Sequence, residues 1–207
     1  MSDKEIDGFK ENSEILRLEP WLDNIRREKP HQLTAEIERI LHEKIVTGRD
    51  AWSRLFDETM ANMKFKLDGA ELTNSEIMSR MADPNNQVRK KAAKAFSREL
   101  KVNVRTLSLI TNTLAKDKEV EDGWRNFKRP VARRNLLNQV EDEVVDSLVQ
   151  TVKNNYQNLS HRYYTLKAQW LNVDRLDYWD RNAPLPNANN EKISWDTAKR
   201  TVLSSYY

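Results

Sequence analysis

The chain has 207 residues, of which 38% are hydrophobic and 32% charged; it contains no cysteine and carries a formal net charge of +3. The lack of cysteine excludes disulfides, zinc ribbons and thiol nucleophiles. No apolar run approaches the ~20 residues needed to span a bilayer, and residues 1–20 lack the apolar core of a signal peptide. We therefore expect a cytoplasmic protein that does not cross a membrane.

The low number of turn-forming residues predicts the fold class. Only 4 Gly and 6 Pro occur in the chain, so long helices with few breaks are expected. One stretch alternates between apolar and polar residues in the manner of a strand. The sequence thus predicts an all-α fold, mainly helical, with one small β-hairpin near 63–72.

The first helices are predicted from apolar residues at helical spacing and from their start and stop signals. The first covers about 11–29, where Pro20 is expected to kink or split it. A second is expected to begin after the capping residue Thr34 and to end at Gly48. A third begins at Asp50.

The hairpin is predicted from a change of period. Apolar residues alternate with polar ones from Met63 onward, and Asp68-Gly69 is a turn signal for a tight hairpin. Thr73 and Glu76 then have the spacing of a capping box, which predicts the start of another short helix.

A long basic helix is expected next, because no helix breaker occurs from Asn85 to about Lys118. Within residues 84–134 there are 14 Lys and Arg residues against five Asp and Glu. Five of these basic residues, which we call the basic stripe, share the helix face opposite the apolar one. They are Lys91, Lys94, Arg98, Lys101 and Arg105.

The remaining helices are expected at about 134–154, about 158–171 and from Ser194 onward. Pro184, Pro186 and the polar run 187–190 separate the last helix from the others. The last helix has no stop signal, so we expect the chain to be cut within an element. Its apolar side should make the isolated chain self-associate or leave it only marginally stable. That side comprises Trp195, Ala198, Val202 and Leu203.

Three domains are expected from these boundaries. Residues 1–82 would form an N-terminal helical subdomain with the hairpin, and residues 83–183 a lobe built on the long helix. Residues 184–207 would form a linker and the start of a further domain.

No complete catalytic or metal site is found in the sequence. His42-Glu43 would need a second histidine at position 46 to begin a zinc-protease motif, and that position is Val46. The acidic residues from Glu141 to Asp146 are expected to complement a helix N-terminus. His161 is expected to be structural, since no nucleophile elbow or phosphate loop accompanies it.

Five groups of residues, read together, resemble the N-terminal part of oligoendopeptidase F, a branch of the thimet-oligopeptidase-like zinc metallopeptidases. The resemblance covers nearly the whole chain from about Ile15 and depends on the order and spacing of the groups. They are 51–57 with 63–78; 83–96; 112–117 with 124–130 and Asn135; 159–167; and 176–186 with 193–198.

The resemblance implies a helical body with a deep central channel, in which a Zn²⁺ ion held by a His-Glu-x-x-His helix and a later Glu cleaves short peptides. The family places these residues after the Trp195 helix, so none is carried over, and the chain alone is expected to be inactive. Lys94, Arg98 and Lys101 are candidates for a channel wall that attracts peptide carboxylates.

The partners expected from the resemblance are short peptides, with no nucleic acid and no membrane. The alternative function is a non-enzymatic helical interaction module that binds nucleic acid through the basic stripe. The stripe has no interleaved aromatic residues for stacking on bases, which disfavours that alternative.

Overall fold

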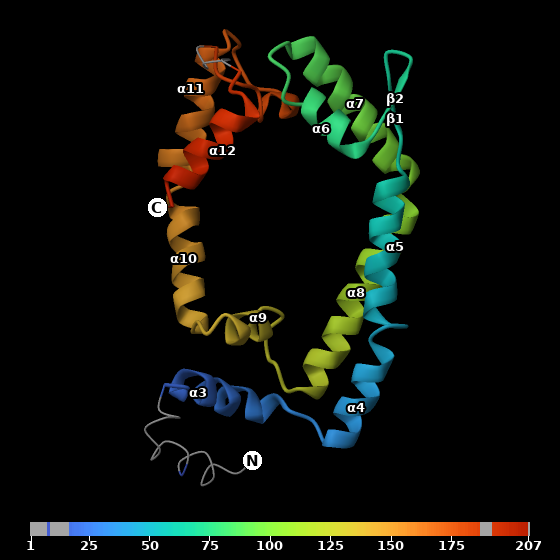
Figure 1. Cartoon of the computed structure of the whole chain (residues 1–207), viewed down its shortest axis with the longest axis vertical. Helices are drawn as coiled ribbons and strands as arrows, with labels where there is room; N and C mark the ends of the chain where they lie inside the picture. Colours follow the sequence, from blue (N-terminus) through green and yellow to red (C-terminus); the bar gives the residue numbers. More distant parts are fainter. Residues whose placement is uncertain (1–7, 9–16, 187–191, 207) are drawn as a thin grey trace.

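The structure, a computed structural model, describes residue 8 and residues 17–186 and 192–206. Figure 1 numbers the elements used below. The part of the first expected helix before Arg17 and the polar run 187–190 lie outside the described residues. The α-helices are α3 (Glu19–Glu28), α4 (Ala35–Lys44), α5 (Arg49–Asn62), α6 (Asn74–Arg80), α7 (Asn86–Val102), α8 (Val104–Trp124), α9 (Ala132–Leu137), α10 (Asp142–Asn154), α11 (Arg162–Trp170) and α12 (Trp195–Ser204).

Short elements complete the description. Two strands, β1 (Phe65–Leu67) and β2 (Ala70–Leu72), form an antiparallel hairpin in which Phe65 faces Leu72. Single turns of 3₁₀-helix occur at η1 (Lys29–His31) and η3 (Tyr178–Asp180), and a π-helical turn, η2 (Gln157–His161), leads into α11. The predicted fold class, all-α with one small hairpin, is confirmed.

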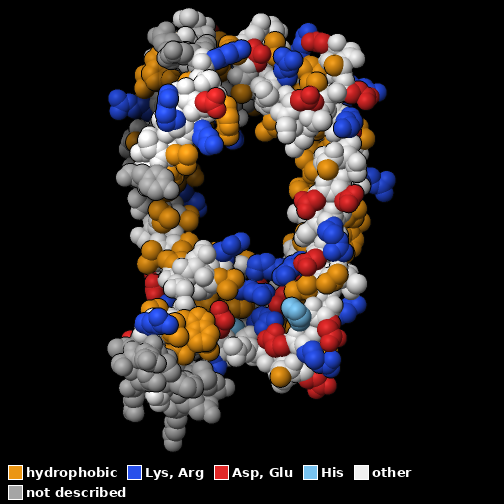
Figure 2. Space-filling view, viewed as in Figure 1, with side chains coloured by type: hydrophobic (Ala, Val, Ile, Leu, Met, Phe, Trp, Pro, Cys, Tyr) orange, Lys and Arg blue, Asp and Glu red, His pale blue; other side chains and the backbone are white. Residues whose placement is uncertain are grey.

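The helices are arranged as an open ring (Figure 1). The chain rises through α4 and α5, turns at the hairpin, and passes through α6 and α7 before α8 returns beside α5. It then crosses to α9, rises through α10 and α11, and comes back against α7 at η3. The space-filling view shows that side chains leave the centre of the ring open (Figure 2).

The core lies where α7 meets the hairpin and α6. Met63, Phe65, Ile77, Ala92 and Ala95 are buried together there. The rings of Phe65 and Phe96 also stack, with centroids 5.3 Å apart. Burial of the large side chains Met63, Phe65 and Ile77, each worth about 1.5–3 kcal/mol, holds the hairpin and α6 against α7.

The ring is closed by a buried ion pair between α7 and η3. Nη2 of Arg89 lies 2.6 Å from Oδ1 of Asp180, and the two side chains are 3% and 2% exposed. Asn86 donates a further hydrogen bond of 2.8 Å to the same oxygen. Segments about 90 residues apart in the sequence are thus joined by charge-assisted hydrogen bonds.

The prediction of one long helix from Asn85 to about Lys118 is wrong. It is interrupted at Asn103, whose φ and ψ are −93° and 3°, and α8 continues in a new direction (Figure 1). The Asn103 side chain donates to the Glu99 backbone carbonyl at 3.1 Å, a local bond that competes with the helix ladder. Arg105 consequently lies on a different helix from the rest of the basic stripe.

Another predicted helix also differs from the structure. The stretch 134–154 is divided into α9 and α10 by a turn in which Gln139 has a φ of 56°. The helix that contains Pro20 is α3, which begins at Glu19, so Pro20 lies in its first turn. Proline is favourable there because its missing N–H would have no partner in a first turn.

Candidate functional site: a cavity between α7 and α11

A cavity of about 1000 Å³ lies between the α6–α7 pair and α11. Its apolar wall comes from α6, α7 and the η3 turn, which meet because η3 closes the ring. Binding sites for small molecules are commonly apolar hollows of about this size with a few polar groups. The apolar side chains that line it include Met78, Met81, Phe96, Leu100, Tyr178 and Trp179.

The η3 turn is held in place by Asp180. Besides its bonds to Arg89 and Asn86, Asp180 accepts a hydrogen bond of 3.2 Å from the backbone N–H of Asp177. Lys90 of α7 lies with its Nζ 5.1 Å from the centre of the Trp179 ring, a cation–π contact. These contacts fix the backbone that presents Tyr178 and Trp179 to the cavity.

A buried lysine joins α11 to the segment after η3. Lys167 is 3% exposed, and its Nζ donates a hydrogen bond of 2.7 Å to the backbone carbonyl of Arg181. Burial lowers the pKa of Lys167, and the nearby Arg89 lowers it further. The bond from Lys167 positions the backbone of Arg181 at the cavity while leaving its guanidinium exposed.

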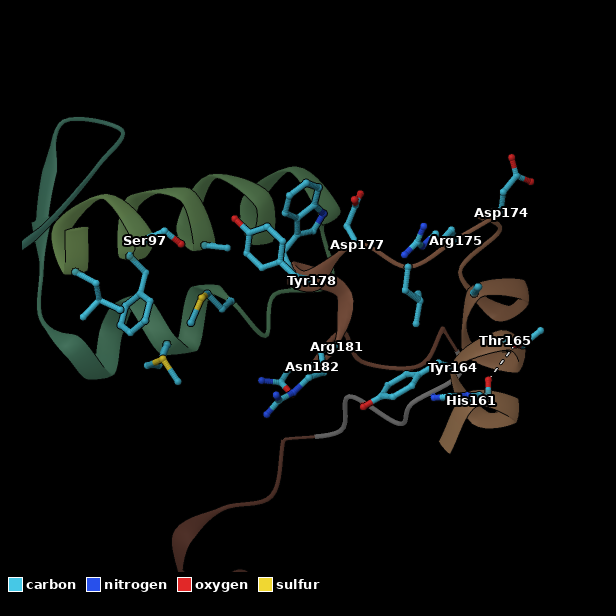
Figure 3. A pocket seen from close by; sticks show the side chains of 18 residues that line it. Ser97, His161, Tyr164, Thr165, Asp174, Arg175, Asp177, Tyr178, Arg181 and Asn182 are labelled. Carbon is cyan, nitrogen blue, oxygen red and sulfur yellow. Dashed lines mark hydrogen bonds between the residues drawn. The ribbon is translucent and has the colours of Figure 1, made fainter. Parts of the chain in front are cut away.

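Polar side chains gather at one end of the cavity (Figure 3). Tyr164 extends toward Arg181 and Asn182, and His161 lies beside Tyr164, whereas Asp174 and Asp177 extend away from this end. The Arg181 side chain forms no ion pair with any described residue. The cavity therefore combines an apolar wall with an end that is rich in hydrogen-bond donors.

The basic stripe does not line this cavity. Nζ of Lys91 pairs with Asp68 at 2.9 Å, and Nη2 of Arg98 donates to the Lys66 carbonyl at 2.9 Å, so both side chains brace the hairpin. Lys94 and Lys101 are exposed and form no ion pair within the part of the chain that the structure describes. The cavity instead receives neighbouring residues of α7, such as Phe96 and Ser97.

The acidic patch at the start of α10 is bound by an arginine. Arg129 lies 3.2 Å from Asp142 and 2.6 Å from Asp146. Its guanidinium holds the pKa of Asp146 below the ordinary value. Asn135 also donates to Asp142 at 2.7 Å. The patch thus anchors the turn between α9 and α10.

The described residues do not fit a metal site. Within 17–186 and 192–206, no three His, Asp or Glu side chains converge in a way that could hold a metal ion. Over the same residues no helix is both long and apolar enough to cross a membrane.

Sequence reasoning missed the cavity because its walls come from segments far apart in the chain. Met78 falls in an expected short helix and Phe96 on the apolar side of the expected long helix, while Tyr164 and Arg181 belong to no catalytic or binding motif. The available signal was the family resemblance, whose groups 63–78, 83–96, 159–167 and 176–186 contain these four residues but give a role to none of them.

Comparison with known proteins finds similarity to oligopeptidases. The N-terminal model of peptidase family M3, described as Oligopeptidase F, matches residues 1–65. An oligoendopeptidase F homologue from Borreliella burgdorferi is 26% identical over 204 residues, which are 98% of this chain and 34% of the relative. Oligopeptidase PepF of Bacillus subtilis is 26% identical over 203 residues, or 93% of this chain and 30% of the relative.

Solved structures share the fold. A crystal structure from Chlamydophila abortus superposes with a TM-score of 0.80 at 17% identity, over 99% of this chain and 35% of that one. Oligoendopeptidase-F from Enterococcus faecium gives a TM-score of 0.76 at 22% identity, over 89% of this chain and 38% of that one. In sequence and in fold, the chain is therefore similar to part of these oligopeptidases. It spans about a third of the length of the curated relatives it matches.

Proposed function

We propose that the chain forms the N-terminal part of a zinc-dependent oligoendopeptidase that hydrolyses short peptides in the cytoplasm. The observation that carries the proposal is the match to an oligoendopeptidase F homologue over 98% of the chain. The proposal takes the Zn²⁺ ligands from residues outside this chain, as the family resemblance implies. The role of this chain is to bind and position the peptide.

The three domains expected from the sequence remain part of this proposal. In it, residues 83–183 carry the basic stripe and most of the residues that line the cavity, to which residues 1–82 add Met78 and Met81. The proposal includes no nucleic-acid partner, because the basic stripe has no interleaved aromatic residues for stacking on bases.

The test is peptide hydrolysis by the protein that contains this chain. We expect hydrolysis of short peptides, its loss on addition of a chelator and its recovery with Zn²⁺. The 207-residue chain by itself should neither hydrolyse these peptides nor retain zinc after dialysis. Stoichiometric zinc or peptidase activity in the isolated chain would contradict this placement of the metal ligands.

The basic stripe supplies a second test of the same function. Lys94, Arg98 and Lys101 would raise the local concentration of peptide carboxylates through a long-range attraction that salt screens. Their replacement by Glu should raise the KM of the active protein at low ionic strength, with the difference fading at high salt. A matched control replaces Lys153, Arg162 and Lys199, which lie on other helices. An unchanged salt dependence of KM in the stripe variant would contradict this role.

A further inference from the structure

We propose that the cavity between α7 and α11 binds the C-terminal residue of a short peptide. The apolar side chain of that residue lies among Met78, Met81 and Phe96, and its free carboxylate is bound by Arg181 with Asn182 and Tyr164. The inference rests on the proposed function for the class of ligand and adds which end and which side chain of the peptide are recognised.

The apolar wall of the cavity determines which side chain the C-terminal residue of the peptide can have. The three named residues come from α6, α7 and the turn between them, and the adjoining core cluster holds this wall in place. Methionine side chains are flexible and polarisable, so a wall with two of them accommodates aromatic and branched groups. Burying such a side chain stabilises a complex by about 1.5–3 kcal/mol, and a charged side chain there would have no partner.

The polar end of the cavity determines the charge of the ligand group that binds there. Arg181, Asn182 and Tyr164 offer guanidinium, amide and phenol donors at one end of the cavity, while Asp174 and Asp177 extend away from it (Figure 3). A carboxylate accepts several such bonds and forms two parallel ones with an arginine. A peptide amide lacks the negative charge, so this end favours a free C-terminus over an internal peptide bond.

The fold keeps this end prepared for a ligand. Lys167, buried at 3% exposure, bonds to the Arg181 carbonyl, and Asp180 of the preceding turn is bound by Arg89. The backbone at Arg181 is therefore anchored from two helices, and only the rotamer of its side chain is ordered when a carboxylate binds. Such preorganisation reduces the entropic cost of binding.

The experiment compares the tripeptide Ala-Ala-Phe with its C-terminal amide on the 207-residue chain, by calorimetry and by tryptophan fluorescence. The acid should bind about tenfold more tightly than the amide, as expected for one charge-assisted hydrogen bond. Arg181→Gln should remove this difference. Arg162→Gln, an equal loss of charge at an exposed position of α11 outside the cavity, should preserve it.

A second variant tests the apolar end. Ser97 lines the cavity, so Ser97→Trp fills part of it and should weaken binding of both peptides about equally. Circular dichroism and thermal unfolding establish that each variant keeps its fold before binding is compared.

The outcomes separate this inference from the proposed function. Equal affinity for acid and amide, or no binding of either, would overturn the inference. So would Ser97→Trp binding both peptides as the unaltered chain does. The proposed function is judged separately, by metal-dependent hydrolysis in the protein that contains the chain. Hydrolysis without a preference for the acid would overturn the inference alone, and a preference for the acid without hydrolysis would overturn the proposed function alone.

Discussion

At the scale of single residues, Arg125 joins the start of the ring to the end of α8. Its Nη1 and Nη2 donate to the two carboxylate oxygens of Glu38 at 2.6 and 2.8 Å, and its Nε donates to Glu121 at 2.8 Å. Nδ1 of His31 lies 2.7 Å from the backbone carbonyl oxygen of Arg125. The His31 ring also stacks on Phe127, with ring centroids 3.9 Å apart. The bidentate geometry makes this pair more specific than an ordinary surface ion pair.

This network makes stability depend on acid pH. The hydrogen bond from Arg125, with one from the Leu33 backbone, lowers the pKa of Glu38 from 4.5 to about 2. A carboxylate whose pKa is lowered by folding contributes fully to the free energy of unfolding above about pH 4.5. This contribution is lost as the pH falls toward about 2. Urea unfolding at a series of pH values should therefore show a stability loss in this window.

The Glu38→Gln variant identifies the group responsible. It should be less stable than the unaltered chain at pH 6, and the gap should narrow as pH falls toward about 2. Glu58→Gln, which changes an exposed carboxylate on α5 outside the first turn of that helix, serves as the control and should follow the unaltered chain throughout. A gap for Glu38→Gln that stays constant with pH would refute the assignment.

The pair Arg89–Asp180 predicts a larger effect of mutation. Asp180→Ala would leave Arg89 and Lys167 buried without their carboxylate, and breaking a buried ion pair costs about 3–5 kcal/mol. The midpoint of thermal unfolding should fall accordingly. Asp146→Ala, which removes a partly exposed partner of Arg129, should change it far less. Equal shifts of the unfolding midpoint in the two variants would show that burial of the Arg89–Asp180 pair adds nothing to stability.

At the scale of the elements, the hairpin turn depends on a positive φ at two successive residues. Asp68 and Gly69 have φ values of 49° and 86°. A Cβ added at Gly69 would contact nothing within 4 Å, so the cost of Gly69→Ala is conformational and amounts to about 1–2 kcal/mol. Chemical denaturation measures this cost. Stability unchanged within error in Gly69→Ala would rule out the strain argument.

Local chemistry made several element ends predictable from the sequence. Thr34 caps α4 by accepting from Ile37, Thr73 forms the capping box with Glu76, and Ser194 caps α12. Each of these bonds joins residues three apart, so the sequence contains both partners. The breaks at Asn103 and Gln139 could not be predicted in this way, because both residues also occur inside helices and only packing of the ring decides between the two conformations.

At the scale of the whole molecule, the ring itself could not be predicted from periodicity. Its closure depends on Arg89 meeting Asp180 across 91 positions, and the cavity depends on that closure. Neither residue belongs to a pattern that predicts a partner. The family resemblance implied a central channel, whereas the arrangement of α6, α7 and α11 around a cavity came from the structure alone.

The last helix predicts how the isolated chain behaves in solution. Trp195, Val202 and Leu203 of α12 are 79%, 56% and 48% exposed. Apolar side chains grouped at helical spacing on an exposed face favour association. We expect the 207-residue chain to self-associate with rising concentration, as sedimentation velocity would show. Trp195→Glu combined with Val202→Lys should weaken the association without changing net charge.

The matched control replaces two equally exposed apolar residues elsewhere. Val102 and Leu109 are 72% and 57% exposed near the junction of α7 and α8. Val102→Glu combined with Leu109→Lys alters the same kind of surface by the same charges. If α12 is the associating face, this control keeps the concentration dependence of the unaltered chain. Equal weakening by both double variants would instead mean that association is a general consequence of apolar surface around the ring. A monomer at every concentration would contradict the prediction altogether.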